Sequence, residues 1–210
     1  MFATEQTGPL DAAIAQMLPI NAVPLEGTFS PLAGAGRRLL VARDGIYVEA
    51  ANDALYVRLR LVALHTPYGE LTEGVALRGA PMPRAFARTL MERSLASHPC
   101  EMAALIVADA GEPAGYRLIE PEGQGHVGQV TYADHGYDDA MLVIDAHSHG
   151  PFPSIFSHTD NASDRSRGGP HLSVVFGHCG ERASTTVAIR ACVGNYLIPL
   201  DETHFSELFA

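Results

Sequence analysis

The sequence predicts an α+β (α/β mixed) fold, and three features lead to this prediction. Short apolar runs separated by turn residues recur along the 210-residue chain, which indicates many strands. One longer stretch, residues 83–98, instead repeats its apolar residues at helical spacing. Hydrophobic residues make up 47% of the chain and charged residues 18%, which is typical of a globular protein with a sizeable core.

The first third of the chain predicts a β-rich extension. An amphipathic helix is expected at residues 10–18, followed by a loop rich in Gly, Pro and Ala. Turn residues then separate three runs with strand character, which predicts a meander of strands at 39–42, 46–50 and 55–64. A loop-like stretch with three Gly and three Pro follows at 67–83. The expected division is therefore an N-terminal extension over residues 1–80 and a second domain over residues 81–210.

The second domain alternates helices and strands. Its helix at 83–98 is expected to end at Pro99, because proline cannot continue a helix. A short helix is expected after Asp160, and it would end at Gly168-Gly169-Pro170. Apolar runs predict strands at 102–108, 117–120, 127–132, 141–146, 172–176, 185–192 and 196–200.

The strand at 141–146 leads into the stretch that carries the most chemistry. His147 and His149 follow it two positions apart, so both side chains point to one face of the strand. Asp160 comes later, after a turn-rich segment. Two imidazoles and one carboxylate suit Zn²⁺ and leave a fourth position open for water, as in catalytic zinc sites. The sequence therefore predicts one zinc ion per chain, bound by His147, His149 and Asp160.

Simpler interpretations of the same residues remain open. A His-x-His pair can be two polar residues at the end of a strand. Ser157-x-x-Asp160 also resembles a capping box, with Ser157 as the N-cap of a helix. This interpretation is compatible with metal binding, since a fixed first helical turn would aim Asp160. His158 stands at no ligand offset and is expected near the surface or behind the ligands, and Asp145 is expected to be structural.

These residues resemble a known motif. His147-Ser148-His149, seven further residues and Ser157-x-x-Asp160 are similar to the JAMM motif of JAB/MPN-domain metallopeptidases. The resemblance covers residues 83–199 and implies a cytidine-deaminase-like curved mixed sheet flanked by helices. The family also has a catalytic glutamate on an early strand after a helix, and Glu101 matches that placement. More narrowly, the overall layout of the chain, a JAB-like domain with an added N-terminal region, resembles protein A of the bacterial ParB-related, ThiF-related cassette (PRTRC).

The resemblance implies a function and partners. Its members hydrolyse amide bonds at the C-terminus of ubiquitin-like or sulfur-carrier proteins, as zinc-dependent peptidases or isopeptidases. Glu101 would be the general base and then the general acid, and Ser157 would donate a hydrogen bond to the oxyanion. The implied partners are a ubiquitin-like protein or its conjugates and a ThiF/E1-like enzyme. One departure is visible: many members have proline directly after the second histidine, whereas here Gly150 precedes Pro151.

Two other functions compete with a peptidase. Metal-dependent amidohydrolases also begin with a His-x-His strand, but their barrels need about 250 residues and place that strand first. Here the motif begins at residue 147 of 210, so the barrel fails on length. The remaining alternative is a non-catalytic MPN-like scaffold that binds partner proteins. Such scaffolds typically lose ligands, and this sequence keeps all three.

The composition of the chain indicates which kinds of partner and which cellular compartment to expect. The net charge of −10, with 14 basic residues that are all arginine, argues against nucleic acid as a partner. The three cysteines, Cys100, Cys179 and Cys192, form no CxxC pair and predict reduced thiols in the cytoplasm. Neither an apolar stretch of about 18 residues nor a secretion signal is recognisable, so no membrane association is expected.

Overall fold

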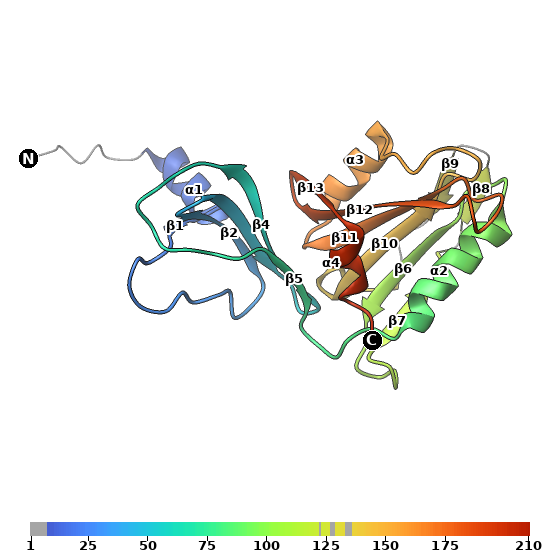
Figure 1. Cartoon of the computed structure of the whole chain (residues 1–210), viewed down its shortest axis with the longest axis horizontal. Coiled ribbons are helices and arrows are strands. Elements are labelled where there is room, and N and C mark those ends of the chain that lie inside the picture. Colours follow the sequence, from blue (N-terminus) through green and yellow to red (C-terminus); the bar gives the residue numbers. More distant parts are fainter. Residues whose placement is uncertain (1–7, 122, 127–128, 133–135) are drawn as a thin grey trace, which may run out of the picture.

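The chain folds into two main β-sheets that lie side by side, which confirms the α+β prediction (Figure 1). The structure is a computed structural model, and it describes residues 8–121, 123–126, 129–132 and 136–210. The smaller sheet has the strand order β1-β2-β3-β4-β5, and the larger has the order β13-β12-β11-β10-β6-β7. Strands β8 and β9 form a separate hairpin. Within the described residues, no helix is long and apolar enough to span a membrane.

The smaller sheet belongs to the N-terminal part of the chain. Its elements are α1 (Pro9–Met17), β1 (Ile20–Ala22), β2 (Gly36–Ala42), β3 (Gly45–Ala51), β4 (Leu55–Ala63) and β5 (Gly74–Leu77). The predicted helix and the three-stranded meander are confirmed. Strands β1 and β5 lie in stretches that the sequence predicts as loops, and that prediction is wrong. Both are too short to show alternation, and they form because the edges of β2 and β4 offer unpaired backbone groups.

The larger sheet and its helices follow from residue 84 onward. The elements are α2 (Arg84–Ser97), β6 (Ala103–Ala108), β7 (Tyr116–Ile119), β8 (Gly123–His126), β9 (Gln129–Tyr132), a 3-10 turn η1 (Asp139–Met141), β10 (Leu142–Ser148), α3 (His158–Ser166), β11 (His171–Gly177), β12 (Thr186–Val193), β13 (Tyr196–Leu200) and α4 (Glu202–Ser206). Most predicted elements are present. Of the strand expected at 127–132, residues 129–132 form β9, and residues 127 and 128 lie outside the described residues. Strand β9 pairs with β8, which the sequence did not predict.

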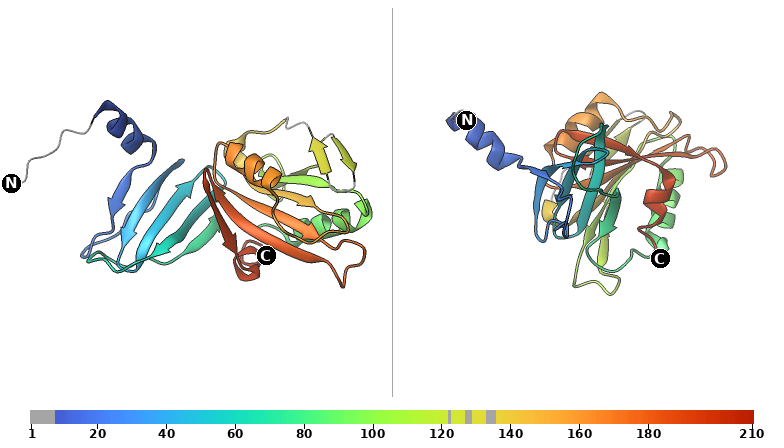
Figure 2. Two further views of the ribbon diagram at one scale, coloured as in Figure 1. Left: turned by 90° about the horizontal axis from the view of Figure 1, so that it is seen from above. Right: turned by 60° about the vertical axis from the view of Figure 1, so that its left-hand side comes forward.

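The two faces of the larger sheet differ sharply in chemistry. In the central strand β10, Ile144 and Ala146 are buried in the apolar core together with Leu90 of α2. The alternate positions of β10, Asp145 and His147, point to the opposite face. Helix α3 covers this second face, while α2 and α4 lie on the apolar one (Figure 2). The polar side chains of β10, Asp145 and His147, therefore lie on the face that α3 covers.

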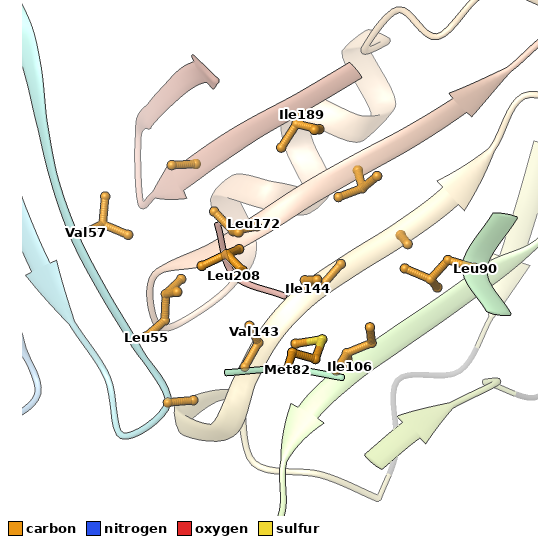
Figure 3. Close-up of a cluster of buried hydrophobic side chains, with 14 of the residues drawn as sticks. Leu55, Val57, Met82, Leu90, Ile106, Val143, Ile144, Leu172, Ile189 and Leu208 are labelled. Atoms are coloured by element: carbon orange, nitrogen blue, oxygen red, sulfur yellow. The ribbon is translucent and has the colours of Figure 1, made fainter. Parts of the chain in front are cut away.

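One apolar core joins the two sheets. Leu55 and Val57 of β4 belong to the same buried cluster as Leu172 of β11 and Leu208 after α4, and Figure 3 shows these side chains meeting. A buried polar contact reinforces the junction, since the side-chain amide of Asn52 donates hydrogen bonds to the carbonyls of Leu142 (3.2 Å) and Pro170 (2.9 Å). The division at residue 80 stays a prediction, and the two parts share a core across it.

Candidate metal centre

The end of β10 carries His147 and His149 and is held on both sides. Strand β10 pairs in parallel with β11 and antiparallel with β6, and the His149 amide donates to the carbonyl of Phe176 at 2.8 Å. Gly150 follows with φ +54°, and a Cβ there would lie 2.3 Å from the carbonyl oxygen of Pro99. Proline has φ near −65°, so it cannot occupy this position. The departure from the family pattern at Gly150 therefore has a local physical reason.

The loop after Gly150 folds back on the end of β11. The amide of His178 donates to the carbonyl of Phe152 at 2.8 Å, and a Cβ at Gly177 would lie 2.2 Å from the amide nitrogen of Ser154. This segment also brings the carbonyl oxygen of Pro153 to 3.1 Å from Nδ1 of His149. If Nδ1 carries the proton and donates to this carbonyl, Nε2 keeps a lone pair for a metal ion.

Helix α3 begins at a capping box that aims Asp160. The Ser157 hydroxyl accepts a hydrogen bond from the Asp160 amide (3.2 Å), and the Asp160 carboxylate accepts one from the Ser157 amide (2.5 Å). The predicted N-cap is confirmed. The same carboxylate reaches the two histidines, so its capping role and its place beside them are compatible. Ser157 is exposed, and its hydroxyl hydrogen is not used in the capping bond.

The three predicted ligand atoms converge. The Nε2 atoms of His147 and His149 are 3.2 Å apart; Asp160 Oδ1 lies 3.2 Å from His147 Nε2, and Asp160 Oδ2 lies 3.6 Å from His149 Nε2. Two ligands of a tetrahedral zinc ion are about 3.4 Å apart when each lies about 2.1 Å from the metal. The three side chains are 12–14% exposed, so they are desolvated but still open to solvent. The spacing and the donor set fit zinc.

Electrostatic coupling within this group is strong. Burial raises the pKa of Asp160, but hydrogen bonds from His147 and His149 outweigh it and hold that pKa far below its usual range. The Asp160 carboxylate in turn raises the pKa of His149, against the opposing effect of burial. The carboxylate therefore favours positive charge beside it, which either protonated imidazoles or a divalent cation can supply.

Glu101 faces the same site from the neighbouring strand. In the antiparallel pair β6–β10, Ala103 lies opposite His147, and the Ser148 amide donates to the Met102 carbonyl at 3.0 Å. Continuing this register places Glu101 opposite His149 and on the same face. Burial raises the pKa of Glu101, while the nearby His149 and His147 lower it. Glu101 precedes β6 by two residues and is buried.

A second group of metal-type ligands lies one turn further along α3. The structure brings together Asp164, His171 and Cys192, which sequence analysis did not assign to any site. Asp164 Oδ2 already accepts hydrogen bonds from Arg190 Nε (2.8 Å) and Nη2 (2.5 Å). The guanidinium of Arg190 therefore supplies the positive charge that a metal ion would supply. The signal for this group is Arg190 itself, a charged residue in an otherwise apolar strand.

Further expectations concern the residues around the motif and the cysteines. Asp145 pairs with Arg167, whose Nη2 lies 2.5 Å from the carboxylate, which confirms its structural role. His158 is exposed, as expected for a position without a ligand offset. The cysteines Cys100, Cys179 and Cys192 are free thiols, as predicted.

Comparison with known proteins identifies the larger part of the chain. Residues 83–191, more than half of it, match the family of prokaryotic homologs of the JAB domain. The chain belongs to the prokaryotic homologs of the JAB domain. All five predicted site residues lie within this JAB domain: Glu101, His147, His149, Ser157 and Asp160. Residues 8–78 match DUF2016, described as a domain of unknown function. A search of curated proteins found no match.

Proposed function

We propose that this JAB domain is a zinc-dependent peptidase or isopeptidase in which His147, His149 and Asp160 bind one zinc ion. The observation that carries the proposal is the triangle formed by His147, His149 and Asp160. The two Nε2 atoms are 3.2 Å apart, and each lies 3.2–3.6 Å from one of the two Asp160 carboxylate oxygens, close to the ligand separations in a tetrahedral zinc site. Three protein ligands leave one position for water or substrate, which is the arrangement of catalytic zinc sites.

Two residues supply the remaining chemistry. Bound zinc would bring the pKa of its water to about 7. Glu101, opposite His149, takes a proton from the attacking water and later delivers it to the leaving amine. The Ser157 hydroxyl has a free hydrogen and is exposed, so it donates a hydrogen bond to the tetrahedral oxyanion. Such a donor contributes about 3 kcal/mol to catalysis.

The proposed substrate follows from the resemblance of the motif and layout. The bond would be an amide at the C-terminus of a ubiquitin-like or sulfur-carrier protein, in a cytoplasmic cassette of the PRTRC type. A ThiF/E1-like enzyme of such a cassette would be a further partner. The net charge of −10 disfavours nucleic acid as the substrate.

The first test is the zinc content per chain, measured by elemental analysis of metal-replete protein. We expect about one zinc in the native protein and a marked loss in Asp160→Ala, which lacks one of the three ligands. Asp201→Ala is a matched control, because Asp201 also caps a helix, α4, but lies outside the site. A native protein that binds no zinc would overturn the proposal and leave the partner-binding scaffold as the better function.

The second test is hydrolysis. The zinc-loaded native protein is incubated with ubiquitin-like conjugates and with unrelated small amides, and the products are followed by mass. Cleavage at the C-terminus of the ubiquitin-like protein supports the proposed substrate class. Cleavage of small amides alone would contradict that class while leaving the metallopeptidase assignment intact.

A further inference from the structure

Helix α3 carries two of the proposed site residues at its start but has almost no apolar means of holding its position. Its sequence, HTDNASDRS, contains mainly residues with modest helix propensity, and it spans only nine residues. Asp164 is its only buried residue. An ordinary surface helix is held by an apolar stripe, which this one lacks. Something other than hydrophobic packing must therefore fix the placement of Asp160.

Arg190 of β12 supplies that hold. Its guanidinium donates two hydrogen bonds to the Asp164 carboxylate, at 2.8 and 2.5 Å, and one to the side-chain oxygen of Asn161 at 2.5 Å. Its Cζ also lies 3.7 Å from the ring centroid of Phe156. Phe156 lies four residues before Asp160, whereas Asn161 and Asp164 lie one and four residues after it. One guanidinium thus contacts the segment on both sides of the proposed ligand.

Asp164 also contacts two other buried side chains, His171 and Cys192. The His171 Nε2 atom lies 3.4 Å from Asp164 Oδ1, and the Cys192 thiol donates to Asp164 Oδ2 at 3.2 Å. The side chains of Arg190, Asp164 and His171 are only 6%, 4% and 1% exposed. A guanidinium that makes three hydrogen bonds in a desolvated pocket is held firmly, and lysine cannot replace it without losing the fork geometry.

An alternative interpretation of this cluster is a second metal site formed by Asp164, His171 and Cys192. The three residues have suitable donor atoms. However, Arg190 already neutralises Asp164, and a divalent ion placed among these groups would lie beside a buried positive charge. The ion pair accounts for the cluster, and a metal ion does not improve it.

We propose that Arg190 is a positioning residue, which holds Asp160 and Ser157 in place through Asp164, Asn161 and Phe156. The role rests on the proposed zinc site, because its consequence is a preformed ligand triangle. Residues that orient metal ligands from behind typically contribute 10–100-fold to metal affinity. Arg190 would do so without touching zinc or substrate.

The test compares three variants by two measurements. Arg190→Lys keeps the charge but loses the fork, Asn161→Ala removes one partner, and Arg38→Met breaks a different, partly buried ion pair, that with Glu49 in the N-terminal sheet. Zinc affinity is measured by competition with a chelator, at a temperature where each variant is folded. Amide hydrogen exchange of residues 158–166 is measured in the metal-free proteins.

Arg190→Lys is expected to weaken zinc binding about 10–100-fold and to accelerate exchange in α3, with a smaller change of the same direction in Asn161→Ala. Arg38→Met is expected to lower the melting temperature while leaving both measurements unchanged. Native zinc affinity and native exchange in a folded Arg190→Lys would overturn the proposal, and if that variant does not fold, Asn161→Ala decides in the same way. A native chain without zinc would instead overturn the proposed function, and α3 exchange would still decide whether Arg190 holds the helix.

Discussion

Asp160 and Asp164 lie one turn apart on α3, and each belongs to a group of potential metal ligands. The Asp160 side chain is 14% exposed and contacts two histidines, whereas that of Asp164 is 4% exposed and is bound by Arg190. Both groups contain residue types that suit zinc. The difference teaches that a set of ligands becomes a candidate metal centre only where no side chain already supplies the positive charge.

The more exposed group, His147, His149 and Asp160, is called here the open group, and it is the one expected to support catalysis. The largest expected effect is that of Glu101→Gln, beside this group. Glutamine keeps the size of the side chain but cannot accept a proton, so we expect turnover to fall about 10²–10⁴-fold. Zinc content should stay near one per chain, because Glu101 is not a proposed ligand. Turnover and zinc are measured on the same preparation, with the exposed Glu112→Gln as control. Full turnover in Glu101→Gln would show that another group carries the proton.

The buried group, Asp164, His171 and Cys192 with Arg190, is called here the closed group, and it is expected to contribute more to the stability of the fold. Asp164→Asn leaves the Arg190 charge buried without its partner, which should cost about 3–5 kcal/mol of the free energy of unfolding. Asp160→Asn keeps a hydrogen-bonding group at the start of α3 but loses the charge that faces His147 and His149, in a more exposed place, so a smaller loss is expected. Urea unfolding of the metal-free proteins measures both. Equal losses in the two variants would erase the distinction between the groups.

Acid should weaken the closed group in a defined range of pH. Burial raises the pKa of Asp164, but His171 and Arg190 outweigh it and lower the pKa to about 2. A carboxyl whose pKa is depressed by folding stabilises the protein above its unfolded pKa, near 3.8, and this contribution is lost as the pH falls from about 4 to 2. The loss should be about 2 kcal/mol.

The variant Asp164→Asn isolates this contribution from those of other carboxyls. The native protein should lose more stability between pH 4 and pH 2 than the variant does, as measured by urea unfolding at each pH. Parallel curves for the two proteins would show that the carboxyl of Asp164 does not change its protonation on folding in this range.

The smallest effect concerns the thiol in the closed group. Burial and the Asp164 carboxylate raise the pKa of Cys192, and burial raises that of Cys179, so both thiols should be inert in the native protein. Cys100 is only partly buried and should be alkylated first. Mass measurement should find one modified thiol in the native protein and three after unfolding. Early modification of Cys192 would mean that the cluster opens readily.

Local patterns explain why much of the fold was predictable. The strands β10 and β11 each contain a short apolar run, 142–144 and 174–176, and α2 shows helical spacing that ends before Pro99. The proposed ligands were also predictable, because two lie two apart at a strand end and the third belongs to a capping box. Strands β1 and β5 were missed, since they depend on partner edges contributed by other segments.

The sequence by itself determined the order of most strands and helices and the candidates His147, His149, Asp160, Ser157 and Glu101. These follow from periodicity, capping and residue chemistry, which act over a few neighbouring positions. Only the tertiary structure decided that Arg190 reaches Asp164, 26 residues away, and that Leu55 shares a core with Leu172. Contacts of this kind depend on strand register and sheet packing across the whole chain, and no local pattern encodes them.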